Sequence, residues 1–233
     1  MNYNVGESAV ITALANISGK VPRNESLHLD AESNKSTLEK YGLTTLSLRN
    51  HNIIDKHKSF FKAVFVRNPY HRLLSVFLEK FHIHKKSESP DEWFNKKVKF
   101  IVKGYRKKRE PLKLTQTAVS FEEFLRYVLD DIKNHRAANH LWKPFYLLNI
   151  PCVVKYDFIG KFETFSQDFS QLFPSLDAND KFINQLLGTA ALETSLFKRY
   201  WSQVPDSILQ EIKKAYEKDF DMFQYDKKFA PYL

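Results

Sequence analysis

A short apolar run that ends at an arginine constrains this chain more than any other feature. Residues 61–66 read Phe-Lys-Ala-Val-Phe-Val, and Arg67 follows directly. A run of this length, interrupted only by Lys62, predicts a buried β-strand. Asn68 is a favourable N-cap, and Pro69 fits the first helical position, where its missing N–H has no consequence. The sequence therefore predicts a strand, a turn and a helix, in that order.

The helix expected after Pro69 carries polar side chains on one face. At 3.6 residues per turn, Arg72, Ser75 and Glu79 share that face. Arg67 lies at the carboxyl end of the predicted strand, where open α/β sheets bind ligands. A guanidinium matches the geometry of a phosphate, and a helix N-terminus adds positive potential. This pattern predicts a phosphate clamp, and the alternative is an ordinary strand–helix unit with Arg67 in a surface ion pair.

The same segment closely resembles the 3′-phosphate-binding segment of carbohydrate sulfotransferases, with the chondroitin/dermatan type as the nearest match. The residues that carry the resemblance are Arg67-x-Pro69-x-x-Arg72-x-x-Ser75-x-Phe77-x-x-Lys80-Phe81. Members of this family use 3′-phosphoadenosine 5′-phosphosulfate (PAPS). The resemblance implies that Arg67 and Ser75 hold the 3′-phosphate of PAPS and that Arg72 belongs to the same cofactor-binding segment.

A second part of the resemblance lies near the N-terminus, at Tyr3-Asn4-Val5-Gly6-Glu7-Ser8. A glycine-containing loop that opens a helix suits phosphate binding but is weak evidence alone. The family's 5′-phosphosulfate loop reads Pro-Lys-x-Gly-x-[Ser/Thr], which implies that Gly6 and Ser8 bind the nucleotide. The family's catalytic loop lysine is replaced by Asn4. The strand that should precede the loop is missing because the chain begins at Met1, so we expect a truncated N-terminus or a shortened, impaired relative.

Two later segments extend the resemblance over almost the whole chain. Residues 152–164 are similar to the family's Tyr-Asp-Phe-Ile-Gly-Lys-x-Glu-Thr strand and turn, and residues 216–225 to its terminal Asp-Phe-x-x-Phe-x-Tyr segment. We expect a central strand at Cys152–Tyr156. Thr164 and Gln167 then predict a capping box for the next helix.

Two amphipathic helices are predicted in the second half of the chain. Ser120 and Glu123 form a capping box in front of an apolar stripe that runs through residues 121–132. A second stripe consists of Ile208, Leu209, Ile212 and Tyr216.

The proton acceptor for sulfuryl transfer is expected to be His140, because an imidazole titrates near neutral pH. The alternative is a histidine that only forms structural hydrogen bonds, and Glu79 is a rival base. The segment around His140 resembles a His-Trp-x-Pro segment near the family's acceptor site, although Leu141 separates His140 from Trp142.

Positive charge points to an anionic ligand. The formal net charge is +9, which favours a nucleotide, an acidic glycan, a nucleic acid or an anionic membrane without choosing among them. Lys198 and Arg199 could close over the nucleotide phosphates, or form an exposed basic pair. The basic stretch 96–109 could contact an acidic acceptor glycan, or be a solvated helix face. No nucleic-acid motif and no P-loop kinase motif is present.

The composition is that of one large domain. The 233 residues, 43% of them hydrophobic, predict a single sulfotransferase domain over residues 1–233, lacking its first strand. Strands alternating with helical stripes predict an α/β three-layer sandwich with a central parallel sheet, and the resemblance implies the P-loop-like sulfotransferase fold. The single cysteine, Cys152, favours a cytoplasmic protein, or a Golgi-lumenal one if an N-terminal anchor is missing. We expect no metal site and no transmembrane segment.

The resemblance implies an enzyme that moves a sulfuryl group from PAPS to a hydroxyl of a carbohydrate. The alternative is a catalytically impaired relative that binds the nucleotide or an anionic glycan, which the replacement of the loop lysine by Asn4 favours.

Overall fold

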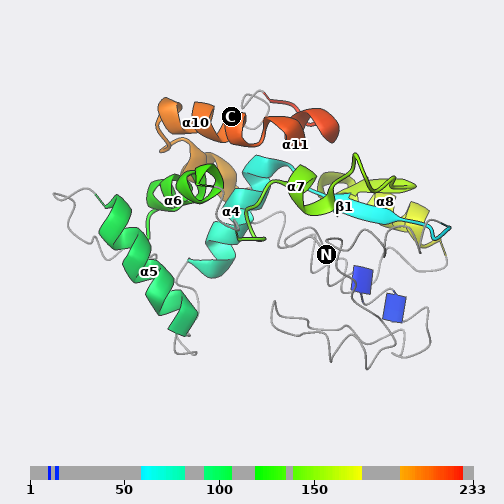
Figure 1. Ribbon diagram of the computed structural model, residues 1–233, viewed down its shortest axis with the longest axis horizontal. Helices are drawn as coiled ribbons and strands as arrows, with labels where there is room; N and C mark the ends of the chain where they lie inside the picture. Colours follow the sequence, from blue (N-terminus) through cyan, green and yellow to red (C-terminus); the bar gives the residue numbers. More distant parts are fainter. Residues whose placement is uncertain are drawn as a thin grey trace. The chain divides into compact units, whose positions relative to one another are not determined.

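The computed structural model shows a mixed α/β chain that is mostly helical and has a small parallel sheet (Figure 1). The α/β class is confirmed, while the three-layer sandwich and the P-loop-like arrangement stay predictions. The chain divides into two compact units, and the single domain over residues 1–233 also stays a prediction. The structure describes residues 10–11, 14–15, 59–81, 92–106, 119–134, 139–174 and 195–227.

The first unit contains two paired strands. Its described elements are β1 (Ala63–Val66), α7 (Phe145–Asn149), β2 (Phe158–Lys161), the 3-10 helix η1 (Phe162–Thr164) and α8 (Phe165–Leu172). The strands are parallel, and Val66 is opposite Lys161 at their carboxyl ends. The rings of Phe65 and Phe165 lie 5.1 Å apart and hold α8 against the strands. Gly160 is required beside Phe65, because a Cβ there would lie 2.5 Å from the ring.

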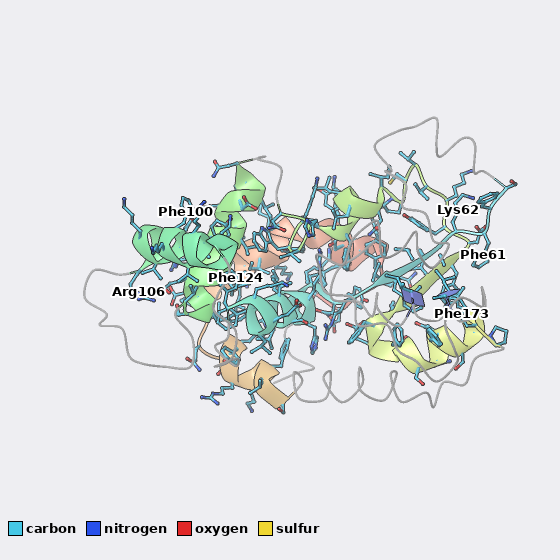
Figure 2. The ribbon with its side chains drawn as sticks, turned by 90° about the horizontal axis from the view of Figure 1, so that it is seen from below. Phe61, Lys62, Phe100, Arg106, Phe124 and Phe173 are labelled. Atoms are coloured by element: carbon cyan, nitrogen blue, oxygen red, sulfur yellow. The ribbon has the colours of Figure 1, made fainter. Side chains whose placement is uncertain are left out.

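β1 begins later than the sequence predicts. Phe61 and Lys62 precede the strand (Figure 2), and Phe61 is 65% exposed. The carboxylate of Asp157 accepts a hydrogen bond from the Lys62 amide at 2.8 Å. The Lys62 carbonyl accepts bonds from the amides of Asp157 and Phe158. These side-chain and backbone contacts connect the strand entrances, so regular pairing begins only at Ala63.

The second strand does not lie where the sequence predicts it. The expectation of a strand at Cys152–Tyr156 is wrong, because the chain turns there and β2 begins at Phe158. Ile150 has a positive φ of 39°. Its carbonyl accepts hydrogen bonds from the amides of Val153 and Val154 at 2.8 and 2.9 Å. This turn uses backbone groups that a strand would need for its ladder.

The capping box expected at Thr164 and Gln167 is also wrong. Thr164 makes no side-chain cap for α8. Its hydroxyl donates instead to the Asp168 carboxylate at 2.7 Å, and the same oxygen accepts the Lys161 amide at 2.6 Å. Asp168, on the first turn of α8, thus connects the helix to the end of β2.

The second unit is helical in its described part. Its helices are α4 (Pro69–Lys80), α5 (Glu92–Tyr105), α6 (Phe121–Lys133), α10 (Asp206–Ala215) and α11 (Glu217–Met222), with a further helical segment at residues 195–201. α6 packs against α4, α5 and α10 (Figure 1). Trp142 and Trp201 are fully buried in this unit. Phe124 lies among the side chains between the helices (Figure 2), and its ring meets that of Trp142 edge-on at 5.9 Å.

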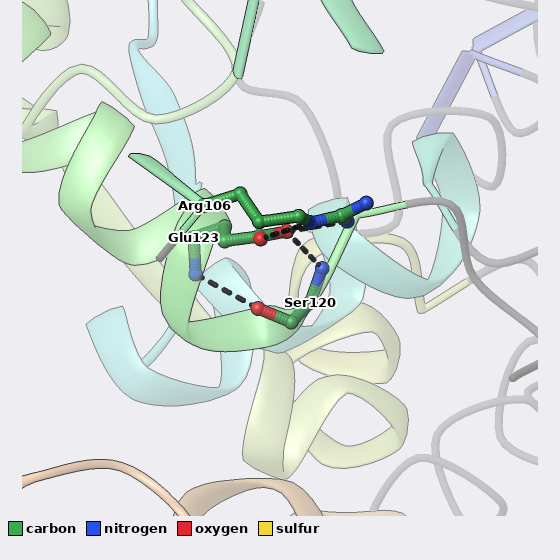
Figure 3. A network of polar contacts seen from close by, with 3 residues as sticks. All are labelled: Arg106, Ser120 and Glu123. Atoms are coloured by element: carbon green, nitrogen blue, oxygen red, sulfur yellow. Dashed lines mark hydrogen bonds and ion pairs between the residues drawn. The ribbon is translucent and has the colours of Figure 1, made fainter. Parts of the chain in front are cut away.

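Both N-caps predicted for the helices of this unit are confirmed. The side chain of Asn68 accepts the Tyr70 amide at 2.9 Å, and Pro69 occupies the first turn of α4. Ser120 and Glu123 form the capping box of α6 (Figure 3). Glu123 also receives two hydrogen bonds from Arg106, at 2.7 and 3.1 Å. One buried carboxylate therefore caps α6 and fixes the end of α5 against it.

The apolar stripe predicted for α10 faces the core. Ile208, Ile212 and Tyr216 are buried, and Leu209 is half-buried. The Tyr216 hydroxyl donates to the backbone carbonyl of Trp142, so one residue of an apolar stripe also makes a specific polar contact.

Candidate functional site

Arg67 lies at the carboxyl edge of the paired strands. Because Val66 is opposite Lys161, the next residues along the two strands are Arg67 and Phe162. The guanidinium carbon of Arg67 lies 4.0 Å from the centroid of the Phe162 ring, and Arg67 is only 4% exposed. A contact of this kind uses the flat face of the guanidinium, whereas anions bind at its N–H edge. This is the sheet edge at which open α/β folds bind ligands.

The N-terminus of α4 in the second unit also suits an anion. Its first turn contains no acidic residue, so this turn itself places no carboxylate at the positive end of the helix. Ser75 is half-buried on the same helix. Arg67 and Ser75 belong to different units, and their joint binding of one phosphate stays a prediction. Glu79, the rival base, is exposed and pairs with Lys80 at 2.6 Å.

Arg72 is almost completely buried, with 1% of its surface exposed. Its Nη1 donates to the backbone carbonyl of Lys143, and its Nη2 to that of His140, both at 2.8 Å. These contacts connect α4 to the segment at residues 139–144, which we call the His140 loop. The expectation that Arg72 binds the nucleotide stays a prediction, but these contacts give it a role within the protein.

The His140 loop is a tight turn organised by its first residue. The carbonyl of Asn139 accepts the amides of Trp142 and Lys143 at 3.1 and 2.9 Å, and its side chain accepts the Leu141 amide at 3.0 Å. Asn139 therefore satisfies several backbone groups of the turn at once.

Two further side chains hold this loop from other helices. Asp131 on α6 accepts the indole N–H of Trp142 at 2.7 Å and the backbone amide of Asn139 at 3.1 Å. Tyr216, directly after α10, donates to the Trp142 carbonyl. Sequence patterns did not reveal either contact. The one signal in the sequence is the place of Tyr216 in a predicted apolar stripe. A tyrosine buried in this way normally has a hydrogen-bond partner for its hydroxyl.

His140 itself is exposed at the loop surface. Partial desolvation of the ring, and then the positive charge of Arg72, lower the pKa of His140 below its ordinary value of 6.5. Both effects disfavour the imidazolium. The imidazole is therefore neutral near pH 7 and able to accept a proton, which is what a general base requires.

The other candidate residues are not brought to this loop by any described contact. Lys198 and Arg199 are exposed on a helical segment at residues 195–201. Asn4, Gly6 and Ser8 lie outside the described residues.

Among the described residues, no group of His, Cys, Asp or Glu is arranged to hold a metal ion. In the same part of the chain, no helix combines the length and the apolar character needed to cross a bilayer.

Comparison with known proteins identifies the family to which this chain is related. A model of the sulfotransferase family matches residues 8–226. Mouse carbohydrate sulfotransferase 12 is 29% identical over 216 residues, which cover 89% of this chain and 49% of that protein. Mouse carbohydrate sulfotransferase 14 is 31% identical over 180 residues, covering 76% of this chain and 46% of that protein. Human carbohydrate sulfotransferase 8 is 28% identical over 229 residues, covering 95% of this chain and 50% of that protein.

The chain spans about half the length of these relatives. No solved structure matches it significantly. The family match covers the strand end with Arg67, helix α4 and the His140 loop. The chain belongs to the sulfotransferase family.

Proposed function

We propose that this chain transfers a sulfuryl group from PAPS to a hydroxyl group of a carbohydrate. The observation that carries the proposal is the buried Arg67 at the carboxyl edge of two parallel strands, in a chain that the sulfotransferase family matches almost throughout. The similarity to carbohydrate sulfotransferases supports a sugar acceptor. We also propose the P-loop-like three-layer sandwich as the complete fold.

The nucleotide would be held mainly by Arg67 and Ser75, which bind its 3′-phosphate. Arg67 is suited to this because its guanidinium is already ordered by Phe162, so binding would cost little side-chain entropy. Ser75 would donate its hydroxyl from α4. The other residues proposed for the nucleotide are Gly6, Ser8, Lys198 and Arg199. Arg72, from the same segment, is proposed to act through its contacts with the backbone carbonyls of residues 140 and 143 and not on the phosphate itself.

His140 is proposed to accept the proton of the attacking hydroxyl. The acceptor oxygen forms a bond to sulfur, and the bond between sulfur and the bridging phosphate oxygen breaks. The leaving group is 3′-phosphoadenosine 5′-phosphate, and the hydroxyl proton moves to the His140 imidazole. PAPS supplies the activated sulfuryl group. Positive side chains and helix N-termini stabilise the charge that develops on the leaving phosphate.

The acceptor is proposed to be a carbohydrate, and the charge of α5 favours an acidic glycan. Lys96, Lys99 and Lys103 are exposed on α5, and the exposed ring of Phe100 lies on the same helix. Lysines spaced three and four residues apart share a helix face. Such a face attracts sulfate or uronate groups, and a solvated structural face is the alternative.

A second candidate is a binding protein that retains the nucleotide site but transfers sulfate poorly. The observation that favours it is Asn4, which replaces the charged lysine of the family loop. If this candidate is correct, Asn4→Lys should increase transfer, because an ammonium near the bridging oxygen stabilises the leaving phosphate. The measurement is the transfer rate of both proteins at saturating PAPS. Unchanged transfer and unchanged nucleotide affinity would contradict the assignment of Tyr3–Ser8 as the 5′-phosphosulfate loop.

The test of the proposed function has two steps. Calorimetric titration with 3′-phosphoadenosine 5′-phosphate measures nucleotide binding, and a sulfate-transfer assay on a panel of neutral and acidic glycans measures activity. Binding with transfer supports the enzyme, and binding without transfer supports the second candidate. Absence of nucleotide binding contradicts both. Competition with DNA checks that the positive charge is not a nucleic-acid site.

A further inference from the structure

We propose that Arg72, Asp131 and Tyr216 are positioning residues that fix the His140 loop from three separate elements, so that His140 is held in place to accept the acceptor's proton. The proposal rests on the proposed function, because it assigns a purpose to the base of the same reaction. None of the three residues needs to touch the substrate.

The first argument is the position of the backbone atoms that Arg72 and Asp131 bind. Arg72 donates to the carbonyl of His140 itself and to that of Lys143, at 2.8 Å each. Asp131 receives the backbone amide of Asn139, the residue directly before His140. The backbone is therefore fixed at His140 and immediately before it. Contacts to backbone atoms fix the loop without occupying the imidazole.

The second argument is that the anchors come from separate elements of one unit. Arg72 belongs to α4, Asp131 to α6, and Tyr216 directly follows α10. Asp131 and Tyr216 both bind Trp142, at its indole N–H and its carbonyl respectively. A loop bound at several of its groups by α4, α6 and the end of α10 is restrained more strongly than a loop held by a single contact.

The third argument is the contrast in burial along the loop. Leu141 and Trp142 are 5% and 0% exposed, whereas His140 is exposed. The rings of Phe124 and Tyr127 enclose Trp142 at 5.9 and 5.5 Å. The loop thus places an apolar anchor in the core and presents one polar side chain at the surface. A general base must be held to a fraction of an ångström, and rigid support of this kind achieves that.

The positive charge of Arg72 also favours the neutral imidazole of His140, which is the form that accepts a proton. Besides partial desolvation, the guanidinium disfavours the protonated ring, and Lys80 on the same helix adds a smaller effect. Asp131 on α6 is the acidic group that binds the loop backbone. Arg72 therefore both holds the backbone of the base and, second to desolvation, lowers the pKa of its imidazole.

The test uses mild substitutions that keep the fold. Arg72→Lys retains the charge but cannot bind two carbonyls as a planar fork. Tyr216→Phe removes only the hydroxyl that binds the Trp142 carbonyl. Arg126→Gln is the matched control, because Arg126 is a partly exposed arginine on α6 that pairs only with Glu122 in the contacts described, at 2.9 Å. Transfer kinetics, calorimetric affinity for 3′-phosphoadenosine 5′-phosphate, and NMR of the His140 ring are measured for each full-length variant.

We expect kcat to fall about tenfold in Arg72→Lys and about threefold in Tyr216→Phe, since small displacements of a catalytic group reduce rate strongly. Nucleotide affinity should stay within about twofold, because the change is in positioning. The His140 ring signals, assigned with His140→Gln, should shift or broaden in both variants and not in Arg126→Gln.

Two results would overturn the positioning role. One is an unchanged kcat in both folded variants, and the other is an unchanged His140 ring spectrum. A wild-type protein that transfers no sulfate would contradict the proposed function instead. In that case the ring spectrum alone decides whether the three residues fix the loop.

Discussion

Two arginines of one short motif have different surroundings. Arg67 and Arg72 are both nearly fully buried, at 4% and 1% exposure. Arg67 lies with its flat face on the Phe162 ring at the edge of the sheet. Arg72 directs both of its terminal nitrogens to backbone carbonyls of the His140 loop.

The difference teaches that a motif match assigns residue types but not their roles. The guanidinium that lies with its face on a ring, at the sheet edge where open α/β folds bind ligands, is the one that we propose for the anion. A guanidinium whose fork binds two carbonyls supports the protein itself. Our account therefore makes Arg67 the residue that recognises the nucleotide and Arg72 the residue that holds the base.

The largest expected effect concerns stability. Arg72→Ala should lower the free energy of unfolding by about 3 kcal/mol, since it removes two charge-assisted hydrogen bonds and leaves two carbonyls without this donor. Chemical denaturation measures the change. Arg126→Gln, which removes a surface pair, should cost no more than about 0.5 kcal/mol. If Arg72→Ala lowers the free energy of unfolding by no more than the control does, Arg72 does not support the protein in the way that distinguishes it from Arg67.

The next effect concerns turnover. His140→Gln should reduce the transfer rate about a hundredfold, because it keeps size and polarity but removes a base that titrates near neutral pH. Nucleotide affinity, measured by calorimetry, should not change. If the variant retains full turnover between about pH 6 and 8, Glu79 becomes the candidate base and the His140 loop loses its proposed purpose.

A comparable effect concerns nucleotide affinity. Arg67→Ala should weaken binding of 3′-phosphoadenosine 5′-phosphate by about 2 kcal/mol, roughly thirtyfold, as expected for the loss of a charge-assisted bond. Titration calorimetry of the folded variant checks this value. An affinity equal to that of the wild type would remove Arg67 from the site.

The smallest effect is a pH dependence. Because the folded-state pKa of His140 lies below 6.5, the unfolded chain takes up the proton first as pH falls. The stabilising contribution of neutral His140 is complete above about 6.5 and is lost as pH falls toward the folded pKa. Denaturation of wild type and His140→Gln at about pH 7 and about pH 5.5 isolates this contribution. The wild type should lose more stability than the variant, and equal losses would contradict the lowered pKa.

The elements with strong local signals were predictable from the sequence. The cap at Asn68 and Pro69 and the capping box at Ser120 and Glu123 are confirmed, because each depends on residues within one helical turn. The second strand was placed too early. A turn around Ile150 and the bridge between Asp157 and Lys62 determine where pairing begins. The turn uses a positive φ at an isoleucine, which local patterns do not predict, and the bridge joins residues 95 positions apart.

The candidate site was only partly predictable for the same reason. The position of Arg67 at a strand end follows from local pattern. The contacts of Arg72 with residues 140 and 143, and of Tyr216 with Trp142, join parts of the chain about 70 positions apart. No short-range pattern reports such pairs, so the sequence predicts Tyr216 only as part of an apolar helical stripe.

The most direct test of the central claim compares two nucleotides on two variants. 3′-Phosphoadenosine 5′-phosphosulfate carries the 3′-phosphate, and adenosine 5′-phosphosulfate lacks it. Calorimetry on Arg67→Ala and Arg72→Lys measures how strongly each protein prefers the first ligand. Our account predicts that Arg67→Ala loses the preference while Arg72→Lys keeps it. Loss of the preference in Arg72→Lys, with retention in Arg67→Ala, would contradict the account and exchange the roles of the two arginines.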